Sequence, residues 1–208
     1  DVLFVPAHVI PVYCPCPAVV TVHDLGFLRF PEAHPPLSRL YLRLGTLFSV
    51  RVARRVIAVS QATKADLVAY LRVPAAKINV VYEACPPGFG PLVDREAGLA
   101  VARRYGLNAP YILSIGTMHP RKNLVRLVEA FAIARRQANL PHQLGLVGQR
   151  GWRGEEVGAA VARLGLTREV VVTGFVPEDK LPLLLGAAQA LAFPSLYEGF
   201  GLPALEAM

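Results

Sequence analysis

Short, strongly apolar runs alternate along this chain with longer stretches whose apolar residues recur at helical spacing. In the first half, helical patterns fall near 37–54 and 61–71, and the apolar runs read DVLFVP, AVVTVH, RVIAVS and INVVY. A half-exposed strand would alternate apolar with polar residues, so runs this apolar indicate strands buried on both faces. The pattern therefore predicts a parallel sheet with helices on both sides.

A proline- and glycine-rich segment, ACPPGFGPLVDR at 84–95, interrupts this rhythm with three prolines and two glycines. Such a segment is typical of a linker, and it predicts an amino-terminal domain over 1–88 and a carboxyl-terminal domain over 89–208. Beyond it the alternation resumes, with the apolar runs PYILSIG, HQLGLVG, EVVVTGF and ALAFPS and helices expected near 95–105, 122–138, 154–164 and 178–187. The predicted fold class is α/β, with two doubly wound layers.

Ligands of doubly wound sheets bind beyond the carboxyl ends of the strands, so the residues after each strand are the first candidates for chemistry. One such segment is GTMHPRKN, where Gly116 lets the chain leave its strand closely and Arg121 and Lys122 precede a helix. Fixed cations and helix-start amides there would suit a diphosphate. The alternative is a solvated basic helix start, which the helix dipole disfavours.

Two other strand-end segments carry weaker signals. GQRGWRG spaces its glycines as Gly-x-x-Gly-x-x-Gly, which differs from the dinucleotide fingerprint, and we assign it no role. His23 and Asp24 follow AVVTV, where His23 could hydrogen-bond a bound hydroxyl or act as a base that Asp24 orients. A structural histidine is the competing interpretation.

The segment SLYEGFGLPALEAM places Glu198 and Glu206 eight positions apart around a Gly-Phe-Gly turn. Pro203 suits a first helical position, which puts Glu206 in the first turns of a helix. Ionised carboxylates accept several hydrogen bonds at once, and flanking glycines let backbone amides approach a polar ligand. The pair could therefore grip sugar hydroxyls, or Glu206 could simply complement the helix dipole.

Composition narrows the classes of partner. The chain is 53% hydrophobic with a formal charge of +7, and no apolar run is long enough for a membrane span. Basic residues are spread along the chain without aromatic interleaving, which argues against nucleic acid. One helical stretch contains Leu40, Leu44, Leu47 and Phe48, and in or beside it lie Arg39, Arg43, Arg51, Arg54 and Arg55. It suits either an anionic lipid surface or a solvated helix face.

The cysteines indicate the cellular compartment in which the protein works. Cys14, Cys16 and Cys85 are odd in number, and the Cys-Pro-Cys pair lacks a second ligand pair at zinc-like spacing. We expect free thiols, no metal site and a cytoplasmic location. The chain opens without a signal-like segment and closes within a helical pattern, so we interpret it as a fragment.

The chain resembles retaining glycosyltransferases of the GT-B fold, a family that includes bacterial mannosyl- and glucosyltransferases. EGFGLPALE, one half-domain after GTMHPRKN, matches the family's Glu-x7-Glu motif, and the resemblance extends over VVTVHDLGFLRFPE, RVIAVSQATKADL, NLVRLVEAFA and GFVPEDKL. It implies two Rossmann-like domains facing a cleft, both incomplete here. The implied reaction transfers a hexose such as mannose from a nucleotide sugar to a glycan or lipid-linked acceptor.

The resemblance also implies a role for each motif residue. Arg121 and Lys122 would bind the diphosphate, and His23 would contact the donor sugar. Glu206 would hold the ribose hydroxyls and Glu198 the transferred sugar. The remaining donor contacts would be backbone at Gly116, at Val176 beside the base, and at Gly199, Phe200 and Gly201 around the sugar. No metal or other cofactor is then needed, and the enzyme would work in the cytoplasm, on its own or at the inner face of the plasma membrane.

Two departures from the family leave alternatives open. Many relatives carry an arginine after the glycine of the phosphate loop, where this chain has Thr117, and Arg121 is the candidate to compensate. The family's first strands, with its glycine-rich acceptor loop, and the elements after residue 208 are absent. A nucleotide-sugar epimerase and a non-catalytic nucleotide-sugar-binding module therefore remain alternatives to the transferase. The base, sugar and acceptor are not identified by the sequence.

Overall fold

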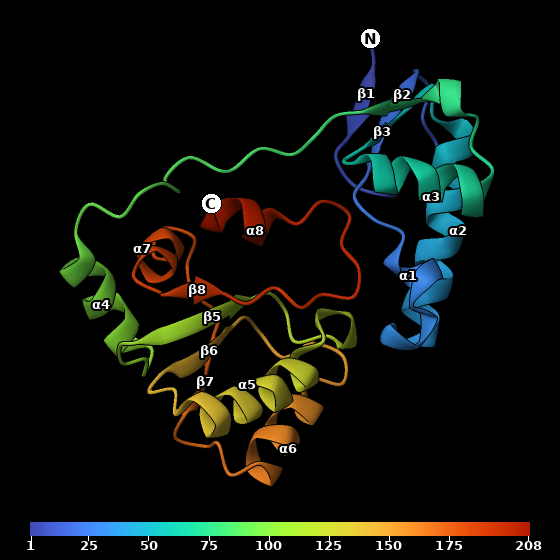
Figure 1. Cartoon of the computed structure of the whole chain (residues 1–208). Coiled ribbons are helices and arrows are strands. Elements are labelled where there is room, and N and C mark those ends of the chain that lie inside the picture. The colour runs from blue at the N-terminus through green and yellow to red at the C-terminus, as the bar shows by residue number, and fades with distance from the viewer. The chain divides into compact units, whose positions relative to one another are not determined.

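The computed structural model describes residues 1–208, and its first sheet has four parallel strands in the order β1-β2-β3-β4 (Figure 1). Parallel pairing runs throughout, with Val20 opposite Val56 and Val56 opposite Ile78. One face packs in a core cluster that joins Val20 and Val56 of the sheet with Val50 and Leu67 of two helices. On the other face Phe4 is 58% exposed and Asn79 is exposed, so the burial on both faces that the apolar runs predicted is incomplete in this sheet. The elements of this region are β1 (Leu3–Val5), β2 (Ala18–Val22), α1 (Gly26–Arg29), η1 (Pro31–Ala33), α2 (Pro36–Val52), β3 (Arg55–Ala58), α3 (Gln61–Leu71), η2 (Ala75–Lys77) and β4 (Ile78–Val80).

Local signals explain where these helices begin and end. Ser60 caps α3 by accepting a 3.0 Å hydrogen bond from the Thr63 amide, and Arg72 closes the helix in the left-handed conformation. Proline stands at the first position of α2, where its fixed φ suits a helix and its missing N–H costs nothing.

The second sheet is also parallel, in the order β7-β6-β5-β8 (Figure 1). Its central strands are buried on both faces: one core cluster includes Leu144 and Leu146, and another includes Tyr111 and Leu113. The doubly wound α/β prediction is confirmed. The elements are α4 (Arg95–Arg104), β5 (Tyr111–Ile115), η3 (Pro120–Lys122), α5 (Leu124–Ala138), β6 (Gln143–Val147), α6 (Glu155–Arg163), β7 (Val170–Gly174), α7 (Leu181–Gly186), β8 (Ala190–Leu191) and α8 (Leu202–Ala207).

Two details differ from the sequence-based predictions. Two strands at sheet edges, β1 and β7, keep exposed apolar side chains where the apolar runs predicted burial, Phe4 at 58% and Val172 at 41%. The helix expected near 178–187 begins only at Leu181, since Pro177 and the following residues form a turn first.

The chain divides into two compact units. The first comprises Asp1–Ala84 together with Tyr197–Gly201, and the second comprises Cys85–Leu196 together with Leu202–Met208. The Gly-Phe-Gly turn therefore packs in the first unit, although it lies near the end of the chain.

No helix in residues 1–208 has both the length and the apolar character needed to span a bilayer.

Candidate functional site

The carboxyl ends of β5, β6 and β7 surround a cavity of about 330 Å³ in the second unit. Gly116 and Gly148 leave their strands with φ of +141°, a conformation that other residues rarely adopt. A side chain at Gly148 would collide with the Gly116 carbonyl, so the two backbones pass directly against each other. The lining residues are Ile115, Gly116, Thr117, Val147, Gly148, Gln149, Phe175, Val176 and Leu181. This is the strand-end position where doubly wound sheets bind ligands.

Lys122 lies at the entrance to this glycine turn. A Cβ added to Gly116 would sit 3.2 Å from the Lys122 Nζ, so the ammonium group lies beside the Gly116 backbone. The same Nζ is 5.6 Å from the centre of the Phe193 ring. The structure thus brings together Gly116 and Lys122, two of the residues predicted to meet a diphosphate.

The turn that carries Lys122 is fixed by hydrogen bonds to the segment after β8. The Arg121 carbonyl accepts from the Leu196 amide at 2.9 Å, and Asn123 Nδ2 donates to the Pro194 carbonyl at 3.2 Å. Asn123 adopts the left-handed conformation, with φ of 59°, and links this 3₁₀ turn to α5. Lys122 therefore lies in a distinct turn before α5, where the sequence pattern predicted the start of the helix itself.

Val176 follows β7 and lines the glycine cavity. The Val176 side chain is only 6% exposed and packs in a core cluster. The neighbouring Phe175, whose ring is exposed, also lines the cavity. An apolar wall next to a cation and a glycine turn can accept a base on one side and a phosphate on the other.

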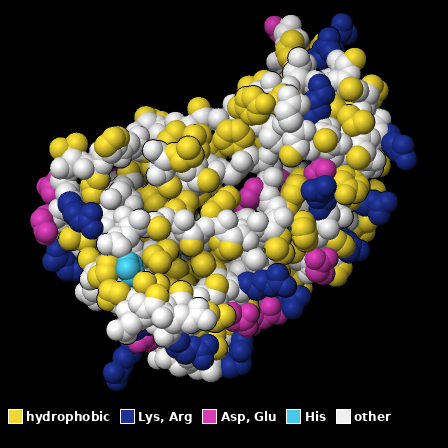
Figure 2. Space-filling view, in the orientation of Figure 1, with side chains coloured by type: hydrophobic (Ala, Val, Ile, Leu, Met, Phe, Trp, Pro, Cys, Tyr) yellow, Lys and Arg dark blue, Asp and Glu magenta, His cyan; other side chains and the backbone are white.

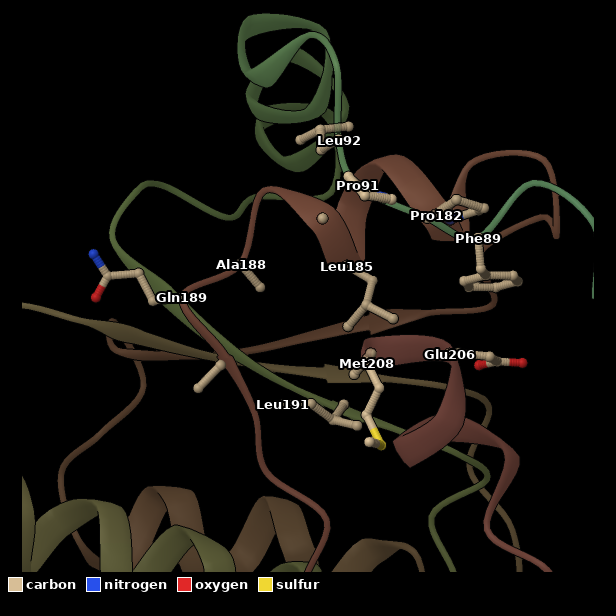
Figure 3. Close-up of a pocket in the computed structure, with 14 residues that line it drawn as sticks. Phe89, Pro91, Leu92, Pro182, Leu185, Ala188, Gln189, Leu191, Glu206 and Met208 are labelled. Atoms are coloured by element: carbon tan, nitrogen blue, oxygen red, sulfur yellow. The ribbon is translucent and has the colours of Figure 1, made fainter. Parts of the chain in front are cut away.

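Glu206 lines a second cavity in the same unit, of about 400 Å³ (Figure 3). Its apolar lining residues include Phe89, Leu185, Leu191 and Met208. Burial raises the pKa of the Glu206 carboxyl, and the nearby charge of Glu178 raises it further. Glu178 follows Val176 by two residues. Glu206 therefore interacts electrostatically with the β7–α7 loop that carries Val176, but it is not among the residues lining the glycine cavity.

In the first unit, both ring nitrogens of His23 are engaged. Nδ1 lies 2.8 Å from Glu83 Oε1, and Nε2 lies 2.8 Å from the Pro6 carbonyl. Both partners offer acceptor oxygens to the ring. The ring stays 46% exposed and lies 5.9 Å from that of His8, whose own pKa is lowered chiefly by burial. His23 is thus held in place yet accessible.

The loop Tyr197–Gly201, which contains Glu198, packs against this His23 region within the first unit. Gly199 is so close to the His23 carbonyl that a side chain there would overlap it. Thr63 Oγ1 lies 3.1 Å from the carbonyl oxygen of His23 and 3.4 Å from that of Gly199. The Phe200 ring lies 6.2 Å from that of Tyr82. The structure therefore brings Glu198, Gly199, Phe200 and Gly201 to the strand end that carries His23.

Tyr197 anchors this loop and was missed by sequence reasoning. Its hydroxyl donates to Asp66 Oδ2 at 2.7 Å and accepts from the Leu25 amide at 3.2 Å. Asp66 is 5% exposed, and burial raises the pKa of Tyr197, so the phenol stays a neutral donor. Tyr197 and Asp66 are 131 positions apart in the sequence. The only sequence signal for Tyr197 as a site residue was its place next to Glu198.

The three cysteines are free thiols, and no group of three or more His, Cys, Asp and Glu side chains in residues 1–208 is arranged to hold a metal ion.

Replacing His23 with alanine in the full-length protein should lower turnover roughly tenfold, the value of about one hydrogen bond to a polar ligand. The melting temperature should change little, because the ring is half exposed. Steady-state kinetics and thermal unfolding measure both, with His142→Ala in the second unit as the matched control. A variant that melts many degrees lower but keeps its specific activity would make His23 a structural residue.

Comparison with known proteins places these two parallel α/β domains, each with a candidate site at its strand ends, in the GT-B fold. The chain belongs to the family described as Glycosyl transferases group 1, whose profile matches residues 103–208. Residues 3–87 match Glycosyltransferase Family 4. The resemblance seen in the sequence is thereby confirmed.

Individual relatives agree with this family. The O-antigen chain mannosyltransferase B of Escherichia coli is 34% identical over 92% of this chain and 50% of its own. The crystal structure of Anabaena HepE in complex with UDP-glucose superposes with a TM-score of 0.74 at 25% identity, over 92% of this chain and 50% of HepE. The structure of sucrose-phosphate synthase from Thermosynechococcus elongatus superposes with a TM-score of 0.69 at 26% identity, over 92% of this chain and 48% of the synthase. The chain spans about half the length of these relatives.

Proposed function

We propose that this chain is part of a retaining glycosyltransferase. The enzyme transfers a hexose, which we propose to be mannose, from a nucleoside-diphosphate sugar to a glycan or lipid-linked acceptor. The observation that carries the proposal is the glycine cavity at the ends of β5 to β7, with the Lys122 ammonium beside Gly116. The 34% identity to an O-antigen mannosyltransferase supports mannose and a polysaccharide acceptor.

In this proposal the donor lies with its base against the backbone at Val176 and its diphosphate at Gly116. Lys122 and Arg121 bind the diphosphate, Glu206 holds the ribose hydroxyls, and Glu198 holds the transferred sugar. The amides of Gly199, Phe200 and Gly201 complete the grip on the sugar, and His23 also contacts the sugar. Because Tyr197 ties this loop to Asp66, Glu198 and His23 would be positioned by one hydrogen-bonded segment.

In the proposed mechanism the main catalytic contribution is stabilisation of the leaving diphosphate by cations, and no protein nucleophile is required. As the glycosidic bond breaks, the departing diphosphate gains negative charge, and a fixed ammonium stabilises that charge more than it stabilises the ground state. Retention would follow from attack on the same face of the sugar, with the leaving phosphate accepting the acceptor's proton. The protein's own cations supply the stabilising charge in this scheme, without a cofactor.

A donor screen on the full-length protein tests the proposal. One of the GDP-, UDP-, dTDP- and ADP-sugars should raise the melting temperature in a concentration-dependent way, because a ligand that binds only the folded state stabilises it. The same donor should then be consumed with transfer of its sugar to an oligosaccharide or lipid-linked acceptor. Donor binding without turnover would make the protein a binding module, and release of a 2-epimerised free sugar without acceptor would make it an epimerase. Either result overturns the transferase proposal.

A further inference from the structure

The carboxylate that meets the His23 ring comes from a distant part of the chain. The sequence suggested that Asp24 could orient this ring, but Asp24 Oδ1 accepts a 2.7 Å hydrogen bond from the Gly26 amide, where α1 begins. The carboxylate at His23 Nδ1 belongs to Glu83, which lies 60 positions further along the chain and 2.8 Å away. Glu83, which no sequence pattern singled out, thus occupies the place expected for Asp24.

The His23 ring lies across the carboxyl edge of the first sheet. His23 comes directly after β2, Pro6 directly after β1, and Glu83 shortly after β4. In the order β1-β2-β3-β4, the strands β1 and β4 are the two edges of the sheet. The contacts of Nδ1 with Glu83 and of Nε2 with the Pro6 carbonyl, each 2.8 Å long, therefore connect the loops at both edges through one side chain.

These two contacts differ in strength. Glu83 offers a carboxylate to the ring, whereas Pro6 offers a neutral backbone carbonyl. Hydrogen bonds that involve an ionised group are roughly twice as strong as those between neutral groups. When a ligand oxygen approaches the ring, we therefore expect the Pro6 contact to be exchanged first. Glu83 then holds the ring at Nδ1 while Nε2 meets the ligand.

Glu83 also differs in its partner from acids of the second unit. There Glu96 pairs with Arg103, and Glu156 pairs with Arg153. On the face that Figure 2 shows, most acidic side chains likewise lie next to Lys or Arg side chains. Exposed pairs of that kind contribute little to stability. A carboxylate on one nitrogen of a strand-end histidine is different, because the contact at one ring nitrogen sets the orientation and tautomer that the other presents.

We propose that Glu83 is the positioning residue of His23, holding Nδ1 so that Nε2 is directed at the donor sugar. This inference rests on the proposed function, in which His23 contacts that sugar, and adds a residue that the function did not include. A ring fixed before binding loses less side-chain freedom when the ligand arrives. The neighbouring Tyr82 ring lies 6.2 Å from that of Phe200, so the segment that carries Glu83 also reaches the loop that carries Glu198.

Kinetics of full-length variants test this positioning. Glu83→Ala should lower turnover up to about tenfold, the loss expected for His23→Ala, and leave affinity for the free nucleoside diphosphate unchanged. Glu83→Gln keeps an acceptor oxygen for the ring and should restore most of the turnover. In a His23→Ala background, Glu83→Ala should have no further effect, because a residue that acts through another is not additive with it. Glu32→Ala, at an exposed acid of the same unit, is the matched control.

NMR of isotope-labelled histidine side chains separates failure of this inference from failure of the proposed function. The His23 ring-nitrogen shifts, assigned by their loss in His23→Ala, should change in Glu83→Ala and largely return in Glu83→Gln, whether or not a sugar is transferred. Unchanged His23 shifts in Glu83→Ala overturn the proposal. So does an equal loss of turnover from Glu83→Ala with and without His23, or a large fall in melting temperature with full specific activity, which would make Glu83 structural. Absence of transfer by the parent protein contradicts the proposed function, and the shifts still decide whether Glu83 positions the ring.

Discussion

Lys122→Ala in the full-length protein is expected to lower turnover about a hundredfold or more, with a smaller loss in donor affinity. That magnitude follows by analogy with removing one donor of an oxyanion hole. The physical reason is that the charge on the departing diphosphate grows as the glycosidic bond breaks, so the ammonium binds the transition state more strongly than the bound donor. Steady-state kinetics and donor titration measure the two quantities separately.

The structure makes this a clean substitution. Lys122 lies in a short 3₁₀ turn whose backbone is held by the bonds from Leu196 and Asn123, so alanine should leave the turn in place. Lys77→Ala is a suitable control, since that lysine lies in the first unit and its Nζ donates to the Arg51 carbonyl. Unchanged turnover in the Lys122 variant would remove Lys122 from the mechanism. An equal loss in turnover and affinity would make it a binding residue only.

The fold was largely predictable from the sequence because parallel strands buried on both faces have a distinctive composition. Runs such as AVVTV and YILSI form β2 and β5 as expected, with helices between them. The position of Gly116 and Val176 was predictable for the same reason, since topology alone places both at the carboxyl ends of strands in one sheet. The position of Lys122 beside Gly116 was not predictable. It results from a 3₁₀ turn that ends at a left-handed Asn123, where the sequence pattern predicted a regular helix.

Long-range polar contacts were not predictable. Asp66 looks like an ordinary polar residue on a helix, yet it is almost fully buried and accepts the Tyr197 hydroxyl from a loop far along the chain. The same holds for Glu83 and Pro6, which engage both nitrogens of His23. These contacts join segments far apart in the sequence, which neither periodicity nor spacing encodes.

The packing of the loop Tyr197–Gly201 in the first unit bears directly on the two glutamates of the Glu-x7-Glu motif. Glu198 belongs to the first unit, in the loop beside His23, whereas Glu206 belongs to the second, on α8 near Glu178. Eight positions of sequence therefore separate two different environments. We expect Glu206 to act on the nucleotide half of the donor and Glu198 on the sugar half.

Substituting each glutamate with glutamine in the full-length protein should separate these roles. Glu206→Gln keeps the size but leaves one acceptor oxygen where two ribose hydroxyls need partners, so affinity for the free nucleoside diphosphate should fall. Hydrogen bonds to a charged group contribute about 1–3 kcal/mol, which corresponds to roughly five- to a hundredfold in Kd. Glu198→Gln should leave that affinity nearly unchanged and weaken binding of the intact sugar nucleotide, or its turnover. Calorimetry of both variants with both ligands measures this.

The pH dependence offers a second test of Glu206. Hydrogen bonds from ribose hydroxyls favour the ionised carboxylate, so binding lowers the pKa of Glu206, and affinity is lost as pH falls through the pKa of the free protein. Burial and Glu178 raise that pKa, so the loss should begin at a higher pH than for an ordinary glutamate. Glu206→Gln should remove this pH dependence, and Glu198→Gln should retain it. If both variants weaken the bare nucleotide equally, or neither affects any ligand, the motif does not divide the donor between two carboxylates, and Glu206 acts only on the electrostatics of its helix.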